Sequence, residues 1–162
     1  MTDKAEKRRP GPPRILNRKA RYQYDVLEVV ECGLELLGTE VKSLRAGSAQ
    51  IGEAHARVRG SQVYLVGANI AAYPQAGPVQ HEPTRPRKLL LHSRQIAQLA
   101  AHVAQKGRTL VPLAIYFKKG WAKCELGLVV GKRAYDKRQA LRSKDQQREI
   151  SREMTRRRRR NE

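Results

Sequence analysis

The last 31 residues, from Lys132 to Glu162, restrict the possible folds of this chain most strongly, because they cannot supply a hydrophobic core. They carry 13 Lys and Arg against 5 Asp and Glu, and they contain no Gly, no Pro and few apolar residues. A segment of this composition is expected to be loose when it is alone. Opposite charges nevertheless stand three or four positions apart, for example Asp145 and Arg148, and this spacing favours a helix. The core must therefore lie in the preceding residues. A cationic tail that is ready to become helical needs an anionic groove, and RNA is the most abundant source of one.

The net charge of +19 over 162 residues is concentrated at the two ends of the chain. Residues 1–19 hold 7 basic and 2 acidic residues, whereas residues 20–131 hold 14 and 8. Basic ends around a moderately basic middle predict phosphate contacts at several places. A tail that only aids solubility is the weaker alternative, because acidic residues serve solubility better.

The sequence gives little support to a membrane, secretory, metal-binding or enzymatic role. No apolar stretch approaches the ~20 residues that a spanning helix needs, and residues 1–13 lack the apolar region of a secretory signal. Two cysteines, Cys32 and Cys124, make no disulfide framework. The four histidines show no metal-ligand spacing, and no catalytic motif is present. We therefore expect a cytoplasmic protein with no catalytic residues, no metal and no cofactor.

Apolar periodicity predicts strands and helices in the middle of the chain. In chain order we predict a strand at 24–36, a short helix at 39–45, a hairpin at 52–71, a loop at 73–86, a short strand at 88–91, a helix that starts at 93 and is ended by Gly107, and a hairpin formed by 110–117 and 121–130. Thr39 and Ser93 are the expected N-caps of the two helices.

Five main strands with a helix between the third and the fourth match an OB-type Greek-key barrel. The predicted fold class is mostly β with α, an OB-type Greek-key β-barrel with flanking helices and disordered basic tails. Residues 1–14 would form a disordered arm, residues 15–131 an OB-like RNA-binding barrel, and residues 132–162 a basic tail that can become helical on an anionic partner. Such barrels commonly bind oligonucleotides, although the fold alone does not prove that use.

Four stretches of this sequence resemble the small protein B family of bacteria, in order and in spacing. They are Asn17-Arg18-Lys19-Ala20 with Tyr24, then Gly38 to Gly47, Glu82 to Leu91, and Gly131 to Arg138. The resemblance departs in small ways, since Glu82 stands where the family commonly has Asp and Arg133 where it commonly has Lys. The run from Arg156 to Arg160 is individual to this chain.

The resemblance implies a role in trans-translation, the rescue of stalled ribosomes. The family binds the tRNA-like part of transfer-messenger RNA and helps to deliver it to ribosomes that lack a codon in the decoding site. Its tail enters the empty mRNA channel, so the resemblance implies that residues 132–162 are helical when bound to the ribosome. The expected partners are thus transfer-messenger RNA and the ribosome, at its decoding centre and mRNA channel, with no membrane and with a monomer when free. The alternative is a general basic RNA-binding or ribosomal protein with an OB-type barrel.

We predict eleven residues of the barrel as RNA contacts, partly from their chemistry and partly from the resemblance. They are Asn17, Lys19, Tyr24, Glu31, Lys42, Arg45, Arg87, Lys88, Leu90, Trp121 and Lys123. Lys19 can meet a phosphate and Asn17 a sugar or base edge, and the resemblance favours RNA contact for both. Glu31 is useful there only if it accepts from a base or orients a neighbouring Arg, and it could otherwise be a solvated residue.

The other candidates also have plain structural alternatives. Lys42 and Arg45 lie three apart and should point together into solvent. Alternation puts Leu90 on the face opposite Leu89 and Leu91, where it contacts RNA or fills a second small core. Tyr24 could pack in the core, and Trp121, which shares the outer face with Lys123, could simply cover a barrel end.

A second group of candidates opens the tail and is expected to bind the ribosome. It consists of Gly131, Lys132, Arg133, Tyr135, Asp136, Lys137 and Arg138. Gly131 releases the chain from the barrel. Tyr135 has too few apolar neighbours in sequence to be buried, and by resemblance it is a candidate to stack on a ribosomal base.

Overall fold

The computed structural model describes residues 11–160, apart from the side chains of residues 134, 135, 137, 140 and 157–160. Over that range the chain is mostly β-sheet with four α-helices. The strands are β1 (Ile15–Leu16), β2 (Tyr24–Leu34), β3 (Ala49–Gln50), β4 (His55–Arg59), β5 (Gln62–Val66), β6 (Asn69–Ile70), β7 (Arg87–Leu90), β8 (Arg108–Lys118) and β9 (Trp121–Gly131). The helices are α1 (Ala20–Gln23), α2 (Gly38–Arg45), α3 (Ser93–Val103) and α4 (Ala134–Arg160), with a 3-10 turn at Pro74–Ala76. The predicted arm falls largely on residues 1–10, which lie outside the described residues.

Seven strands form one antiparallel sheet in the order β1-β8-β4-β5-β7-β2-β9, and β8 also pairs directly with β9. The two short strands β3 and β6 pair separately. The predicted order of the longer elements is confirmed: a strand, a short helix, two strands, a helix and two strands. The strands β1, β3 and β6 were not predicted, because two residues are too few to show alternation.

Two clusters of apolar side chains support the sheet. The larger one is built from inward residues such as Leu65, Ile115 and Leu126, all of them buried. A smaller cluster joins Ala20 of α1 to Val111 and Val129. Burial of each large apolar side chain contributes about 1.5–3 kcal/mol relative to exposure. The two long strands β8 and β9 supply buried side chains to both clusters, so they hold the two clusters together.

The predicted alternation of β2 is wrong in its first half. Strict alternation along residues 24–36 puts Val26 on the same face as the buried Cys32 and Leu34, but Val26 is 38% exposed. The pairing of β2 with β9 shifts register between Val26 and Glu28, where an extra residue forms a bulge and reverses the faces. From Val30 onward the alternation holds, and the strand ends at Leu34 rather than at residue 36.

Both predicted N-caps are also wrong by one or two residues. Helix α2 begins at Gly38, and the carboxylate of Glu40 accepts from the backbone N–H of Leu37 at 2.8 Å. The hydroxyl of Thr39 instead hydrogen-bonds to His81 at 2.8 Å. In α3 the N-cap is His92, whose N–H is accepted by the side chain of Gln95 at 3.1 Å, so that Ser93 is the first helical residue.

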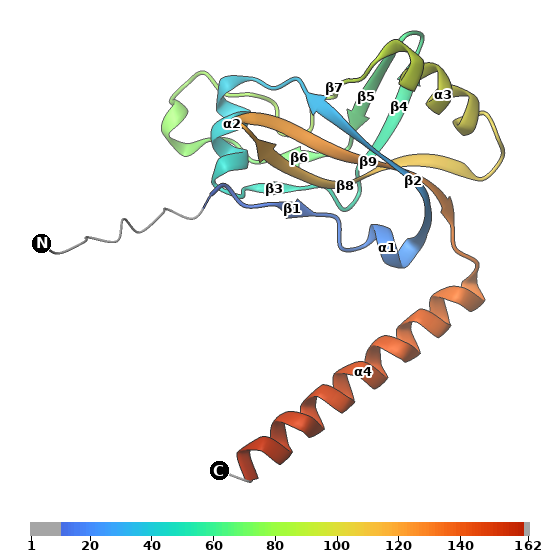
Figure 1. Cartoon of the computed structure of the whole chain (residues 1–162). Coiled ribbons are helices and arrows are strands. Elements are labelled where there is room, and N and C mark those ends of the chain that lie inside the picture. The colour runs from blue at the N-terminus through green and yellow to red at the C-terminus, as the bar shows by residue number, and fades with distance from the viewer. Residues whose placement is uncertain (1–10, 161–162) are drawn as a thin grey trace, which may run out of the picture.

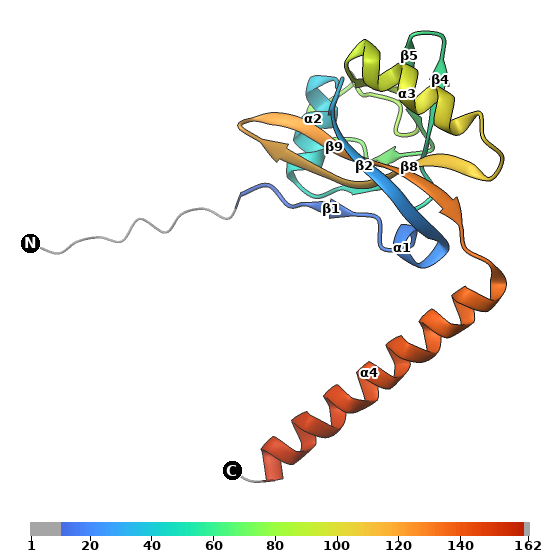
Figure 2. The same cartoon turned by 45° about the vertical axis from the view of Figure 1, so that its right-hand side comes forward.

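The elements are arranged with two distinct ends, which Figures 1 and 2 show from different sides. Helix α2 and the tip of the β8–β9 hairpin lie at one end, and α3 with β4 and β5 lies at the other. Helix α4 leaves the end of β9 beside α1 and projects away from the sheet. In residues 11–160, no helix combines the length and apolar composition that crossing a membrane requires.

Candidate nucleic-acid interface

A groove lies between the end of β2, helix α2 and the tip of the β8–β9 hairpin, and we call it the hairpin groove. Its volume is about 500 Å³. The lining residues are Gly33, Leu34, Glu35, Leu36, Val41, Leu90, Phe117, Gly120, Trp121, Ala122 and Lys123. Two of its apolar side chains face solvent, since Trp121 is 74% exposed and Leu90 is 49% exposed. The outward direction predicted for both is confirmed. Exposed rings and apolar edges of this kind can stack on bases or riboses.

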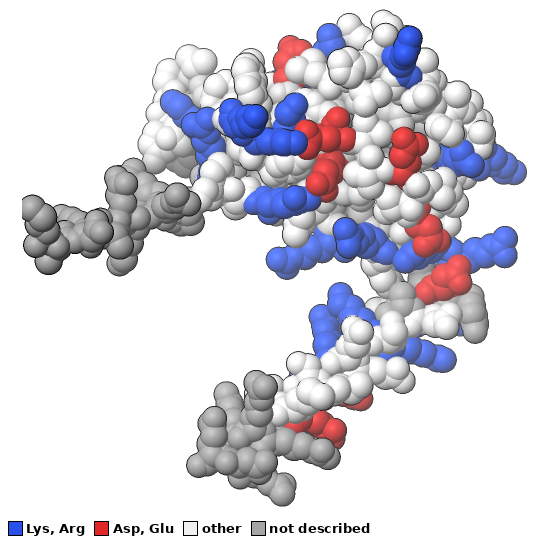
Figure 3. Space-filling view, viewed as in Figure 1, with Lys and Arg blue, Asp and Glu red and all other residues white. Residues whose placement is uncertain are grey.

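Cations surround the hairpin groove. Lys42 and Arg45 project from α2, as predicted, and both are exposed. The Lys42 Nζ lies 5.3 Å from the ring centre of Tyr73, and the Arg45 guanidinium lies 5.4 Å from that of Phe117. Such contacts hold the flexible side chains in place while the charge stays in water. Figure 3 shows basic side chains gathered over this end of the molecule.

Four further cations lie on the strands and the turn around the hairpin groove. Lys123 lines the groove itself. Lys118 and Lys119 precede it at the hairpin tip, where Lys119 adopts φ +50° and Gly120 φ +82°. Lys88 is half-buried and shares the outer face of β7 with Leu90, because positions two apart on a strand point the same way. The structure therefore brings six of the predicted RNA contacts to one end of the molecule: Lys42, Arg45, Lys88, Leu90, Trp121 and Lys123.

Glu31 is held on the outer face of the same strands by a network that the sequence did not reveal. Its carboxylate accepts from the hydroxyl of Tyr116 and, at 3.2 Å, from Lys118 Nζ. Glu31 lies directly opposite Glu125 on β9, and like charges in that position repel. Arg14 offsets this repulsion, since it pairs with Glu125 at 2.5 Å and lies 4.8 Å from the ring centre of Tyr116.

This network fixes the protonation of both of its central groups at neutral pH. The hydrogen bonds from Tyr116 and Lys118 hold the pKa of the Glu31 carboxyl below its ordinary value. Burial and the bond to Glu31 raise the pKa of Tyr116 to about 12. Glu31 is thus an ionised, oriented acceptor within a basic surface. The groups that bind its carboxylate are Tyr116 and Lys118, whereas the prediction offered a base or a neighbouring Arg for Glu31 to orient.

Arg87 was predicted to contact RNA, but the structure buries it completely. Its Nε donates to Glu40 at 2.8 Å, and its two terminal nitrogens donate to the carbonyls of Ala68 at 2.6 Å and Pro83 at 2.7 Å. Both side chains of the Glu40–Arg87 pair are 0% exposed. Arg87 therefore cannot reach a phosphate, and it joins α2 to the loop before β7.

The buried pair could have been found from the alternation itself. Arg87 and Leu89 are two residues apart on β7, so that a buried Leu89 implies an inward Arg87. Burial raises the pKa of Glu40, but hydrogen bonds from Arg85, from the N–H of Leu37 and from Arg87 outweigh it, and the pKa lies below its ordinary value. Both Glu40 and Arg87 are therefore charged at neutral pH.

Asn17 is likewise placed as a structural residue rather than as an RNA contact. It is 7% exposed. Its amide nitrogen donates to the carbonyls of Ile51 at 3.1 Å and Pro112 at 2.9 Å, and its amide oxygen accepts from the N–H of Ala20 at 3.0 Å. All the polar groups of the side chain are engaged, so the amide fixes the start of α1 against β8.

Lys19 and Tyr24 are accessible but lie at the other end of β8 and β9. Lys19 is exposed and pairs with the exposed Glu53. Tyr24 is half-buried and packs against the small apolar cluster, which is the structural alternative considered for it. Along β8, about 20 Å separates Pro112, next to this region, from the tip residue Lys118. The structure thus does not bring Lys19 and Tyr24 to the hairpin groove.

The predicted ribosome-binding residues lie at the junction of the sheet and α4. Gly131 pairs with Tyr24, and Lys132 Nζ donates to the carbonyl of Arg21 at 2.9 Å. Arg133 and Asp136 are exposed. The remaining candidate Arg138 is exposed on the first turns of α4, whereas the side chains of residues 135 and 137 lie outside the described part of the structure.

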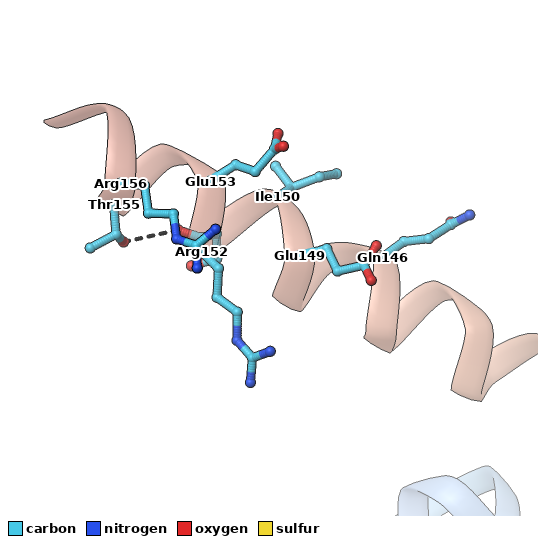
Figure 4. A pocket seen from close by; sticks show the side chains of 8 residues that line it. Gln146, Glu149, Ile150, Arg152, Glu153, Thr155 and Arg156 are labelled. Atoms are coloured by element: carbon cyan, nitrogen blue, oxygen red, sulfur yellow. Dashed lines mark hydrogen bonds between the residues drawn. The ribbon is translucent and has the colours of Figure 1, made fainter. Parts of the chain in front are cut away.

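The middle of α4 presents an open surface. Figure 4 shows that the side chains lining it, such as Gln146, Ile150 and Arg152, all come from this one helix. Ile150 and Met154 are 56% and 65% exposed. The segment is helical in the structure, as its charge spacing favours. That this helix requires a bound ribosome stays a prediction.

The described residues hold no group of three or more His, Cys, Asp or Glu side chains arranged to bind a metal. Cys32 and Cys124 lie opposite each other on β2 and β9, and both are buried. The hydrogen bond with Cys32 and burial raise the pKa of the Cys124 thiol well above its ordinary value. A buried thiol of high pKa is a poor nucleophile, so the pair acts as core.

The chain is similar to several known proteins. The family model for the SmpB protein matches residues 14–156. An SsrA-binding protein of Rhodopirellula baltica is 45% identical, over 86% of this chain and 80% of the relative. Another, from Halalkalibacterium halodurans, is 50% identical, over 84% of this chain and 88% of the relative. A solved structure described as "tmRNA-SmpB: a journey to the center of the bacterial ribosome" is similar with a TM-score of 0.66 and 46% identity, and the match covers 80% of this chain and 95% of that one.

Proposed function

Because the chain belongs to the SmpB protein family, we propose that it binds transfer-messenger RNA and carries it to stalled ribosomes in trans-translation. The observation that supports this most strongly is the family match over residues 14–156. The partners are transfer-messenger RNA and the ribosome, and the family binds RNA rather than catalysing a reaction. These partners imply work in the bacterial cytoplasm, where the free protein would be a monomer.

The hairpin groove is the proposed site for the tRNA-like part of the RNA. Its exposed Trp121 and Leu90 suit stacking against bases and riboses. The cations of α2 and of the hairpin suit the phosphates on either side, and Glu31 suits a base amino or imino group. Lys19 and Tyr24 would contact a more distant part of the same RNA. We no longer include Asn17 and Arg87, because their polar groups are buried and already bonded.

The tail is the proposed ribosomal element. Gly131 to Arg138 would lie near the decoding centre, and α4 would follow the empty mRNA channel. The direction of α4, away from the sheet, supports this division between a binding body and a reaching tail (Figure 1). The basic residues from Arg138 to Arg156 fall on about one half of the helix circumference, by the period of 3.6 residues, and this face suits a channel walled by RNA.

A closed OB-type Greek-key barrel is the finer fold assignment that we propose for residues 15–131. The pairings support it. Each strand in the series β8-β4-β5-β7-β2-β9 is hydrogen-bonded to the next, and the last strand, β9, pairs again with the first, β8. Closure of this kind leaves few open edges, which protects a small β-rich protein from pairing with other chains.

Two measurements test the proposed function. The first identifies the RNA that co-purifies with the protein from its own cells, and we expect transfer-messenger RNA to be enriched. The second compares binding of the tRNA-like domain with binding of an unrelated structured RNA in a salt series. Both affinities should fall with salt, but the preference should survive, because shape and base contacts set it. Equal affinity for the two RNAs at physiological salt would instead indicate a general basic RNA-binding or ribosomal protein.

A further inference from the structure

The loop that follows β6, residues 71–81, lies beside α2 at the end of the molecule that carries the hairpin groove (Figure 1). We call it the Tyr73 loop. It belongs to a run, residues 60–81, without a single Lys, Arg, Asp or Glu, although 30% of the chain is charged. An uncharged loop does not attract phosphates by itself, so its place beside the cations of α2 needs another explanation.

The Tyr73 loop is closed by hydrogen bonds of its own. The N–H of Tyr73 donates to Gln80 Oε1 at 3.1 Å, and Gln80 Nε2 donates back to the carbonyl of Tyr73 at 2.6 Å. The Gln80 side chain thus pairs with the backbone of Tyr73 as a neighbouring strand would. Between them Pro74 opens a 3-10 turn, and Gly77 adopts φ +66°, which a residue with a side chain rarely does. The backbone of Tyr73 is therefore fixed although the loop is on the surface.

The Tyr73 loop is fastened to helix α2 by His81, which is 4% exposed. His81 Nε2 lies 2.9 Å from the carbonyl oxygen of Ile70, and Nδ1 lies 2.8 Å from Thr39 Oγ1. A carbonyl oxygen only accepts, so Nε2 carries a proton, and Nδ1 can then accept from the hydroxyl of Thr39. Thr39 and Lys42 stand three residues apart and therefore on the same side of α2. The anchor at Thr39 thus brings the loop next to Lys42.

The ring of Tyr73 steadies Lys42 without neutralising it. Lys42 Nζ lies 5.3 Å from the ring centre of Tyr73. Within the part of the chain that the structure describes, no carboxylate forms a salt bridge with Lys42. The difference matters, because a carboxylate would compete with a phosphate for the ammonium, whereas a ring leaves its charge uncompensated. Arg45, one turn further along α2, is held by the ring of Phe117 in the same manner.

We propose that Tyr73, held by Gln80, is a positioning residue for transfer-messenger RNA, because it directs the Lys42 ammonium toward a phosphate at the rim of the hairpin groove. A lysine side chain that is free in water loses its rotamer freedom when it binds a phosphate, and this loss weakens binding. A lysine that already rests on a fixed ring has less freedom to lose. The uncharged loop therefore serves RNA binding through the cation that it orients. This inference rests on the proposed function, since it takes Lys42 as a phosphate contact of that RNA.

The test is a double-mutant cycle with Tyr73→Leu and Lys42→Met in the full chain. Affinity for the tRNA-like domain is measured by fluorescence anisotropy in a salt series. At physiological salt, Tyr73→Leu should weaken binding roughly 2- to 10-fold, the range for ordering one long side chain, and the salt slope should stay unchanged because no charge is lost. Lys42→Met should weaken binding and lower that slope by about 1. In the Lys42→Met background, Tyr73→Leu should have no further effect.

Two further variants separate the ring from the rest of the loop. Tyr73→Phe keeps the ring face and should bind like the wild type. Gln80→Leu, at an exposed position, removes the hydrogen bonds to Tyr73 without changing the ring, and it should reproduce the loss only when Lys42 is present. Gln80→Leu also keeps the inference testable if Tyr73→Leu does not fold.

Three results would overturn the inference. A loss from Tyr73→Leu that is as large in the Lys42→Met background as in the wild type would mean that Tyr73 acts independently of Lys42. Binding of Tyr73→Phe as weak as that of Tyr73→Leu would assign the effect to the hydroxyl rather than to the ring. Unchanged binding of both Tyr73→Leu and Gln80→Leu would show that the loop does not orient Lys42. In all three cases the wild type still prefers the tRNA-like domain over an unrelated structured RNA, whereas the absence of that preference would refute the proposed function itself.

Discussion

Replacing Arg87 with Met should lower the melting temperature strongly and leave the RNA affinity of the folded protein nearly unchanged. The substitution leaves the buried Glu40 carboxylate without one of its two arginines, and it removes the donors to the carbonyls of Ala68 and Pro83. Breaking a buried ion pair by removing one partner costs about 3–5 kcal/mol. Because about 1 kcal/mol corresponds to a shift of roughly 4 °C in a domain of this size, we expect a decrease of about 10–20 °C.

The matched control is Arg45→Met, which removes the same group from the exposed face of α2. It should change the melting temperature by less than about 2 °C. It should weaken binding of the tRNA-like domain and lower the salt slope by about 1, the effect of one lost phosphate contact. Unfolding is followed by circular dichroism, and binding by fluorescence anisotropy at a temperature where both variants are folded.

The double variant with Glu40→Leu and Arg87→Met separates the pair from its surroundings. It removes both charges, and the remaining Arg85 is partly exposed and can turn to water. We expect it to be more stable than Arg87→Met alone, because no buried carboxylate is left short of partners. A variant Arg87→Met that melts like the wild type but binds RNA weakly would refute the structural role and restore the original prediction of an RNA contact.

Three further predictions concern the carboxylates and the tail. Glu31→Gln and Tyr116→Phe should each weaken binding of the tRNA-like domain, about tenfold for Glu31→Gln, with little change in melting temperature; tighter binding of the Gln variant would make Glu31 a merely solvated residue. The pKa of Glu40 in the folded protein lies below its ordinary 4.5, so the contribution of its carboxylate to stability is complete above that pH and is lost as the pH falls through the folded pKa. The melting temperature of the wild type should therefore decrease below about pH 4.5, and that of Glu40→Gln should decrease less. Residues 15–131 alone should fold and bind transfer-messenger RNA but fail to support rescue in a translation assay. A comparison of the amide signals of residues 132–162 in the free protein and on the ribosome tests whether the helix depends on its partner.

Local periodicity was enough to predict most of the fold. Alternation placed the hairpins and turned Leu90 and Trp121 outward, because a strand exposes every second residue whatever its partners are. It failed at the bulge near Val26, since one extra residue in the pairing with β9 reverses the faces and nothing in β2 itself requires that residue. The predicted N-caps of α2 and α3 were wrong because the side chains of Glu40 and Gln95, one turn into each helix, accept from the backbone N–H of Leu37 and His92.

The chemistry of the site divides in the same way. Composition, charge and motif spacing indicated by themselves that the chain binds RNA, and they identified most of the cations and the exposed ring that surround the hairpin groove. Only the tertiary structure decided that Asn17 and Arg87 are internal braces and that Glu31 is oriented by Tyr116. A charged side chain has the same formal charge in every context, but its solvation and its partners depend on segments far away in the sequence. The tertiary fold therefore determines whether that charge stabilises the protein or remains available to a ligand.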